Sequence, residues 1–412
     1  MTQWVKLAFR NILRNKRRSL VTLLAIGVGF AAISVYHGYI YDAYEGLRAM
    51  AIRGEGLGHL RINKAGWKER GKLEPEKFMF SREEADAIMR LLKEEKDVIL
   101  ATPQIQVTGL VSNGTVSTVF IAQGVVPHDE KIIRGRWTKF LPIQGEVLSD
   151  EILYGVEMAS DLARYLSLKE GSEGVVMAPT LTGQMNALDI VVRGVYNTGN
   201  DFSNDKFIRL NFHYAQSLLD TQSVERVVVL LDDWKKTEKM RQRLLQKLKN
   251  AGLDCEIRTW DELSLGFSKM KSYLDTVFLF IFTIVLVIVV MTTVNTMGMA
   301  IVERTREIGT LRALGMKRRS VTLLFAWEGA MLGLGGSLAG TVLHLVAWMV
   351  IKIYPPHYMP PGFSVPVPMM VAMLPGMLLL LSLCFIVLSA VAAIIPARRA
   401  ARQNIVNALG HA

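Results

Sequence analysis

Cysteine is scarce in this chain of 412 residues, and its two cysteines lie in unlike surroundings. Cys384 falls inside a long apolar run, whereas Cys255 falls in a polar region. The two are therefore not expected to pair, and neither a disulfide framework nor a cysteine-based zinc site is predicted. A domain of the size of residues 42–275 can be stable without such crosslinks.

The sequence also lacks the short motifs of common catalytic sites. No Gly-x-x-x-x-Gly-Lys-Ser/Thr segment occurs, so this sequence contains no P-loop of its own. Residues 335–339 differ from a nucleophile elbow by one letter, but they lie in an apolar run rather than a strand–turn–helix. The histidines are scattered, with no His-x-x-x-His pair: His37, His59, His128, His213, His344, His357 and His411. We therefore predict no catalytic residue, no metal site and no cofactor in this chain.

Charge is almost absent from four long runs, which cover residues 19–41, 276–302, 320–351 and 368–395. Only Glu328 carries a formal charge within them. A helix needs about 20 apolar residues to cross a bilayer core, so each run predicts a transmembrane helix. The first run has no obvious small-x-small cleavage site at its end, which favours an uncleaved anchor over a signal peptide.

The positive charge of the chain, +11 in total, gathers beside these runs. Basic residues dominate residues 1–18, the loop 303–319 and the tail 396–412. This is the pattern of cytoplasmic segments flanking membrane spans rather than of a nucleic-acid groove. The positive-inside rule then predicts that residues 42–275 and the short loop 352–367 lie outside the cytoplasm.

Residues 1–18 are amphipathic. Apolar side chains recur at helical spacing from Trp4 to Leu13, and Lys6, Arg10 and Arg14 occupy the opposite face. This favours a helix lying in the cytoplasmic membrane interface. An ordinary charged lead-in to the first span is the alternative.

Residues 42–275 predict an extracytoplasmic α+β domain. Two β-α-β patterns, within residues 42–112 and 222–262, predict an α/β lobe near the membrane, and residues 113–221 predict an inserted β-rich lobe. Within the inserted lobe we expect short strands, one of them at residues 145–148, and one helix at about residues 154–166. A helical pattern over residues 263–273 runs into the second span, which favours a rigid lever over a flexible joint near Gly266.

The third span carries two features beyond hydrophobicity. Gly329, Gly333, Gly336 and Gly340 form two Gly-x-x-x-Gly motifs, which predict close helix packing within the bundle or across a dimer. Glu328 is a buried carboxylate about two turns inside the span, where a charge is costly. Pairing with an arginine of the neighbouring loop is favoured over a proton relay, because no second acid lies in the spans.

The loop 303–319 has the most specific sequence pattern in the chain. Its first part has an apolar stripe, dense charge and a terminal glycine: Glu303, Arg304, Arg306, Glu307, Ile308, Leu311, Leu314 and Gly315. A short helix of this kind suits docking into a groove of another protein. A solvated basic loop is the alternative.

Residues 303–315 closely resemble the coupling segment of ABC permeases of the MacB/FtsX/LolC-LolE superfamily. Residues 10–19 and 396–402 match two further signatures of that superfamily, and residues 162–171 resemble LolE-like permeases. In size and layout the chain looks closest to the lipoprotein-releasing LolC/LolE permeases, whereas MacB carries its ATPase fused in front of the first span.

The resemblance implies a bacterial inner-membrane permease without its own ATPase domain and with a MacB-like periplasmic domain. It would dimerise with itself or a related permease, and two copies of a separate ATPase, which bind ATP and Mg, would dock at residues 303–315. ATP hydrolysis would move the periplasmic domains. In LolC/LolE-like permeases this movement would extract lipoproteins or lipids and pass them to a periplasmic carrier. Export of a peptide or small molecule with a periplasmic adaptor, or a non-transporting sensor, stays as the alternative.

Overall fold

A computed structural model describes residues 10–11, 16–71, 73–135, 142–360 and 362–402. It contains two compact units, which are described separately. The helical unit comprises Met1–Tyr44, Lys271–His357 and Pro368–Ala412, and the α+β unit comprises Glu45–Met270 and Tyr358–Val367. Most of the predicted interfacial helix of residues 1–18, and most of the tail 396–412, lie outside the described residues.

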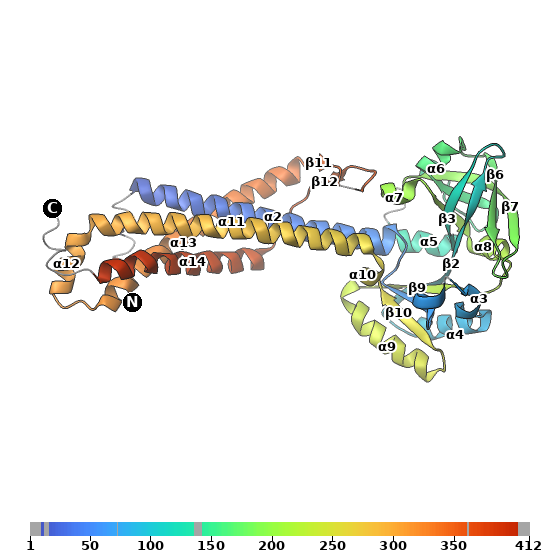
Figure 1. Ribbon diagram of the computed structural model, residues 1–412, viewed down its shortest axis with the longest axis horizontal. Helices are drawn as coiled ribbons and strands as arrows, with labels where there is room; N and C mark the ends of the chain where they lie inside the picture. Colours follow the sequence, from blue (N-terminus) through green and yellow to red (C-terminus); the bar gives the residue numbers. More distant parts are fainter. Residues whose placement is uncertain (1–9, 12–15, 72, 136–141, 361, 403–412) are drawn as a thin grey trace. The chain divides into compact units, whose positions relative to one another are not determined.

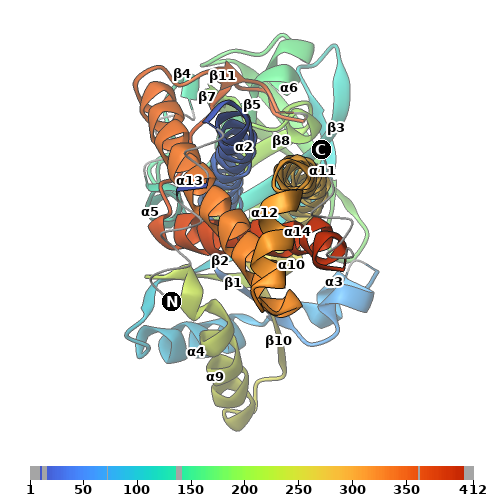
Figure 2. The same ribbon diagram turned by 90° about the vertical axis from the view of Figure 1, so that its left-hand side faces the viewer.

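Among the described residues, four long helices make up the helical unit, and all four are long and apolar enough to cross a membrane. They are α2 (Lys16–Ala49), α11 (Leu265–Glu303), α13 (Arg318–Ile353) and α14 (Pro375–Ala401). They run side by side, with the short helix α12 (Thr305–Ala313) at one end of the bundle (Figures 1 and 2). α11 is continuous from Leu265 through the second predicted span, without a break at Gly266.

The fourth span differs at both ends from the sequence expectation. α14 begins at Pro375 rather than at residue 368, because proline suits the first turn of a helix and disfavours helical backbone before it. The expected span ends at residue 395, but the helix continues to Ala401, with Pro396 inside it. Ala393 and Ala397 are fully buried around it, so tight packing holds the helix through the proline.

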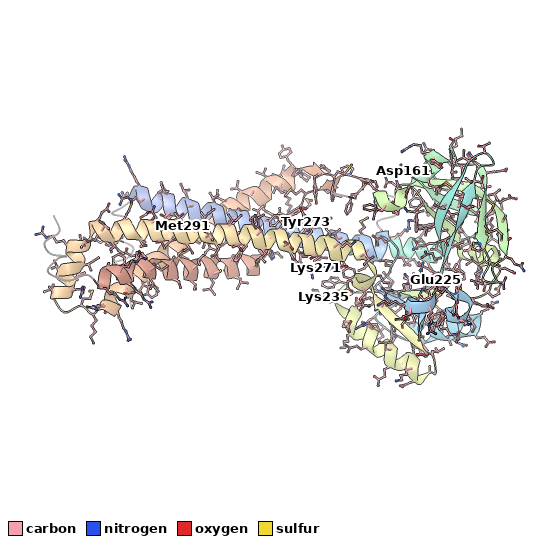
Figure 3. The ribbon with its side chains drawn as sticks, in the orientation of Figure 1. Asp161, Glu225, Lys235, Lys271, Tyr273 and Met291 are labelled. Carbon is pink, nitrogen blue, oxygen red and sulfur yellow. The ribbon has the colours of Figure 1, made fainter. Side chains whose placement is uncertain are left out.

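The interior of the bundle is apolar and closely packed. Ile26 and Phe30 of α2 are fully buried, as are Phe325 of α13 and Phe385 of α14. The rings of Phe30 and Phe385 meet edge to face, with centroids 5.5 Å apart. In contrast, Met291 of α11 is 68% exposed and points away from the bundle (Figure 3).

The α+β unit is built on one continuous sheet. Its strands are β1 (Leu60–Lys64), β2 (Val98–Ser112), β3 (Ser117–Val125), β4 (Pro142–Gly145), β5 (Gly155–Ala159), β6 (Glu173–Pro179), β7 (Met185–Tyr196), β8 (Phe207–Asn211), β9 (Arg226–Leu231) and β10 (Cys255–Thr259). The order is β10-β1-β9-β2-β3-β8-β5-β7-β4, and β6 pairs with both β2 and β7. The strands β2, β3, β8, β5, β7 and β6 therefore close a barrel.

Short helices and turns cover this sheet. The helices are α3 (Pro75–Phe78), α4 (Arg82–Lys93), α5 (Pro127–Arg134), α6 (Ser160–Tyr165), α7 (Asp201–Asn204), α8 (Phe212–Leu218), α9 (Thr237–Asn250) and α10 (Trp260–Leu263). The turns are η1 (Met50–Gly54), η2 (Trp67–Gly71) and η4 (Trp234–Lys236), and the hairpin strands are β11 (His357–Tyr358) and β12 (Val367–Pro368). A capping box between Ser81 and Glu84 begins α4.

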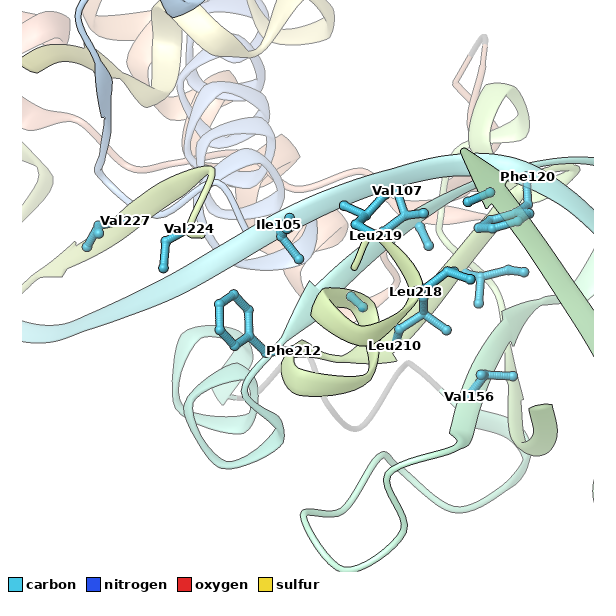
Figure 4. Packing of buried hydrophobic residues seen from close by; sticks show 14 of the residues in the cluster. Ile105, Val107, Phe120, Val156, Leu210, Phe212, Leu218, Leu219, Val224 and Val227 are labelled. Atoms are coloured by element: carbon cyan, nitrogen blue, oxygen red, sulfur yellow. The ribbon is translucent and has the colours of Figure 1, made fainter. Parts of the chain in front are cut away.

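One hydrophobic core runs through the barrel and the lobe beside it. Ile105 and Val107 of β2 alternate with polar neighbours and point inward, toward Phe120, Val156 and Leu210 (Figure 4). The long strand β2 pairs with β9 over its first half and with β3 and β6 over its second half. It therefore belongs to both lobes and joins their cores.

The prediction of a helix over residues 154–166 is wrong for the first half of this segment. Residues Gly155–Ala159 form β5, a fully buried strand between β7 and β8, and only Ser160–Tyr165 are helical. Pairing on both sides overrides the weak local preference of this segment for helix. The strand expected at residues 145–148 lies instead at Pro142–Gly145, where it pairs with the end of β7.

A buried charge cluster fixes α5 on the barrel. Arg209 of β8 donates from Nη1 to Glu157 Oε2 of β5 at 2.8 Å, and its guanidinium lies 4.0 Å from the ring centre of Tyr196. Arg134 of α5 pairs with Glu130 in the same helix, and Glu130 Oε1 lies 3.9 Å from Arg209 Nε of β8; all five side chains are buried. Burial raises the pKa of the Tyr196 phenol to about 12, so it stays neutral at physiological pH.

Candidate coupling site

The helix α12 follows α11 after a single non-helical residue, Arg304. It ends where Gly315 adopts a φ of +99°, which a glycine accepts without strain. The N–H of Gly315 donates to the Arg312 carbonyl, and the N–H of Met316 donates to the Leu311 carbonyl, both at 3.0 Å. These bonds satisfy the last carbonyls of α12 and turn the chain into α13.

One face of α12 is anchored in the helical unit. Arg304, Thr305 and Ile308 are buried, and Ile308 packs in the apolar cluster of the bundle with Val321 and Ala400. This spacing places them on one side of a helix. The inward face thus holds α12 against the ends of the long helices.

The buried Arg304 meets the buried Glu328. Arg304 Nη1 donates to Glu328 Oε1 at 3.1 Å, and Asn11 Nδ2 donates to the same oxygen at 2.5 Å. The ion pair with a loop arginine is therefore the arrangement present in the structure. It ties the start of α12 to the interior of α13, at a place where an unpaired carboxylate would be costly.

The opposite face of α12 is exposed. Arg306 and Glu307 lie on it, together with two apolar side chains, Leu311 and Leu314. Leu314 is 81% exposed and Leu311 is 37% exposed. An exposed face that combines apolar and charged side chains has the composition of a protein-binding surface.

Two polar contacts tie α2 to α11 near the coupling helix. Arg18, in the first turn of α2, pairs with Glu303, the last residue of α11. One turn further in, the hydroxyl oxygens of Thr22 and Thr296 lie 2.7 Å apart. Glu303 therefore interacts with α2, beside the exposed face of α12.

The four glycines of the two Gly-x-x-x-Gly motifs pack against two different helices. A Cβ on Gly329 would lie 2.5 Å from the Ser389 carbonyl oxygen, and Gly333 faces the same helix, α14. A Cβ on Gly340 would lie 2.7 Å from the Gly27 carbonyl oxygen, and Gly336 also faces α2. Both Gly-x-x-x-Gly motifs therefore serve packing inside one chain.

Sequence reasoning named the residues of α12 and favoured an arginine of this loop as the partner of Glu328, but it did not identify Asn11 and Arg18 as polar partners. Asn11 and Arg18 belong to the basic segment before the first span. This segment holds several other arginine, lysine and asparagine residues, so the sequence does not single these two out. Nothing in local periodicity indicates that Asn11 meets Glu328, because the two are far apart in the chain. Nor does it distinguish Arg304, which is buried, from Arg306, which is exposed.

Comparisons with known proteins agree with this architecture. The family model described as FtsX-like permease C-terminal matches residues 279–405. The macrolide export ATP-binding/permease protein MacB 1 of Yersinia pestis bv. Antiqua is 24% identical over 408 residues, which cover 98% of this chain and 60% of that protein. The lipoprotein-releasing system transmembrane protein LolC of Neisseria meningitidis serogroup B is 22% identical over 380 residues, covering 85% and 83%.

Among solved structures, the periplasmic region of MacB from Actinobacillus actinomycetemcomitans matches with a TM-score of 0.37 and 15% identity. That match covers 53% of this chain and 95% of the other.

The described residues thus combine four apolar helices, a short helix after the second and an α+β unit, and residues 279–405 of this arrangement match the FtsX-like permease model. The chain as a whole is similar to MacB, an ATP-binding/permease protein by its name, and to LolC, a transmembrane protein of a lipoprotein-releasing system. It spans 60% of the length of the MacB proteins that it matches.

Proposed function

We propose that this chain is the permease component of an ABC-type transport complex, in which an ATPase subunit docks on α12. ATP hydrolysis in that subunit, which binds ATP and Mg, drives movement of the α+β unit. The observation that supports this most directly is the division of α12 into an anchored face and an exposed face. A force applied to the exposed face passes into the bundle because the other face cannot shift independently.

Within this proposal the residues of α12 have separate tasks. Arg306, Glu307, Leu311 and Leu314 contact the ATPase, since their side chains are exposed. Arg304 acts as a positioning residue, because its guanidinium is buried against Glu328. The basic residues around α12 support a cytoplasmic location for α12, and the α+β unit then lies in the periplasm of a bacterial inner-membrane protein.

The transported material is a lipoprotein or lipid. It is extracted from the membrane and handed to a periplasmic carrier, which takes it toward the outer membrane. Similarity to a lipoprotein-releasing LolC over most of both chains supports this substrate class. The working complex contains two permease chains, identical or related, and two ATPase subunits. Export of a peptide or small molecule through a periplasmic adaptor is the second candidate, since a macrolide export protein matches nearly the whole chain.

The docking step is tested by reversing two exposed charges on α12. The double variant Arg306→Glu/Glu307→Arg and the wild type are purified from membranes in mild detergent, and bound P-loop ATPase is identified and assayed. We expect the wild type to retain the ATPase and the variant to lose it. Arg319→Glu, an exposed reversal outside α12, is the matched control and should retain the ATPase.

The docking proposal fails if the double variant binds and stimulates the ATPase as the wild type does. Recovery of a kinase or a hydrolase with the wild type, in place of an ATPase, would instead support a sensor that does not transport.

A further inference from the structure

The segment between α13 and α14 is free of formal charge. Residues 353–374 contain no aspartate, glutamate, lysine or arginine, and they are rich in proline, methionine and aromatic side chains. The middle of this segment, Tyr358–Val367, belongs to the α+β unit and is called the strap here. The strap is thus part of the α+β unit although both of its ends continue into helices of the helical unit.

Backbone hydrogen bonds attach the strap to the turn that contains α7. The N–H of Asp201 donates to the Gly362 carbonyl at 3.1 Å, and the N–H of Ser364 donates to the Gly199 carbonyl at 3.3 Å. Asn200 and Phe363 form an isolated β-bridge between these bonds. This pairing depends on backbone groups, so it fixes the strap without using the apolar side chains on its surface.

The strap and the turn with which it pairs both carry exposed apolar side chains, which are together called the patch here. Phe202, at the start of α7, is 75% exposed, and Met359 of the strap is 60% exposed. Tyr358 and Val365 are each more than a third exposed. The ring of Phe202 lies beside Gly362, where a Cβ would meet it at 3.0 Å, so the aromatic side chain is held in place although it is open to the surroundings. Exposed apolar clusters of this kind mark interaction sites.

Covalent continuity with membrane helices indicates what covers the patch. Tyr358 follows the last residue of α13 by only five residues, a reach of about 17 Å in extended chain. Val367 precedes α14 by eight residues. A segment so close to the ends of two spans, with apolar and aromatic side chains and no charge, fits the layer between lipid headgroups and acyl chains.

We propose that Phe202 and the strap side chains Tyr358, Met359 and Val365 insert into the interfacial layer of the adjacent membrane leaflet. The α+β unit then rests on the lipid surface at this patch, in addition to its links through α2 and α11. This inference requires only that the long helices span the membrane, so it stands or falls independently of ATPase docking on α12.

Membrane insertion is tested with nitroxide labels on the full chain in proteoliposomes of phosphatidylethanolamine and phosphatidylglycerol. Cys255→Ala and Cys384→Ala remove the two native cysteines. Phe202→Cys and Met359→Cys are then labelled separately, and collision rates with oxygen and with a water-soluble nickel complex are measured. Oxygen concentrates in lipid and the nickel complex stays in water, so their ratio reports depth.

Two labels on the same unit serve as matched controls. Tyr165→Cys in α6 and Val119→Cys in β3 replace exposed apolar side chains outside the strap and α7, each 62% exposed in the wild type. We expect the labels at 202 and 359 to collide severalfold more often with oxygen than with the nickel complex, and the control labels to show the reverse.

The inference is overturned if the labels at 202 and 359 are as accessible to the nickel complex as those at 119 and 165. Strong spin–spin broadening at 202 would also overturn it, because a second copy of the chain would then cover the patch. Labelling at two positions keeps the test decisive when one variant fails to fold, and elution as a single species in gel filtration verifies each labelled protein.

Discussion

Arg304 Nη1 donates to Glu328 Oε1 at 3.1 Å, which joins the residue before the coupling helix to the interior of α13. Both side chains are buried, and Asn11 supplies a second donor to the same carboxylate oxygen. A buried pair of this kind resists separation, since each charge would be left in a poorly solvating environment. The beginning of α12 is thereby held at one position on the bundle.

Removing only one member of this pair should be more harmful than removing both. We expect Glu328→Ala to destabilise the helical unit by about 3–5 kcal/mol, because Arg304 is left buried without its charge partner. The double variant Arg304→Met/Glu328→Met should recover much of this loss. Thermal unfolding of the purified protein in detergent measures both, and equal loss in the single and double variants would contradict the assignment.

The glycines of α13 should respond to substitution according to their surroundings. A Cβ on Gly333 would lie 2.8 Å from the Cα of Ile386, so Gly333→Ala must push α13 and α14 apart. Overpacking of this kind costs about 1–3 kcal/mol. Gly298 of α11 has no atom within 4 Å of the corresponding position, so Gly298→Ala should be neutral or stabilising. A thermal unfolding series comparing these two variants decides the point, and destabilisation of equal size in both would refute the packing role.

The charge cluster under α5 predicts a contrast between two arginines of the barrel. Arg209→Met leaves Glu157 buried without its partner, and we expect a loss of about 3–5 kcal/mol in the stability of the α+β unit. Arg193 of β7 pairs with Glu146 at 2.6 Å on the surface, and Arg193→Met should change stability by about 1 kcal/mol or less. Denaturant unfolding followed by intrinsic fluorescence compares the two, and losses of similar size would show that burial does not set the cost.

His59 predicts a loss of stability in mild acid. Its Nδ1 accepts the N–H of Leu231 at 3.0 Å, which requires a neutral ring. Burial, and next the charge of Arg53, lower the pKa of His59 from its usual 6.5 to about 4. The folded state therefore binds this proton less readily than the unfolded chain. The contribution of neutral His59 to the free energy of unfolding is complete above pH 6.5 and declines as the pH falls toward 4.

The free energy of unfolding should fall by about 3 kcal/mol over this range, because the pKa of His59 is about 4 in the folded state and 6.5 in the unfolded chain. Unfolding measured from pH 7 to pH 4 should show a slope that His59→Gln reduces and that His128→Gln, at an exposed histidine, leaves unchanged. An identical slope in all three proteins would rule out His59 as its source.

Sequence alone was sufficient for the parts of the protein whose signals are local. The length of an apolar run decides whether a helix can cross a bilayer, and three of the four expected spans lie wholly within helices of the structure: α2, α11 and α13. The amphipathic pattern of residues 303–315 likewise contains its own helix and its own stop at Gly315. The capping box before α4 depends on two residues three apart, so it too could be recognised in advance.

Only the tertiary structure decided how these elements meet. Gly155–Ala159 is a strand because β7 and β8 lie on either side of it, and the barrel closes because β6 pairs with β2 and β7. The inward direction of Arg304 depends on Glu328 and Asn11, neither of which is near it in the chain. Periodicity records which face of an element is apolar, but the partner of that face is set by contacts between distant residues, which no local pattern contains.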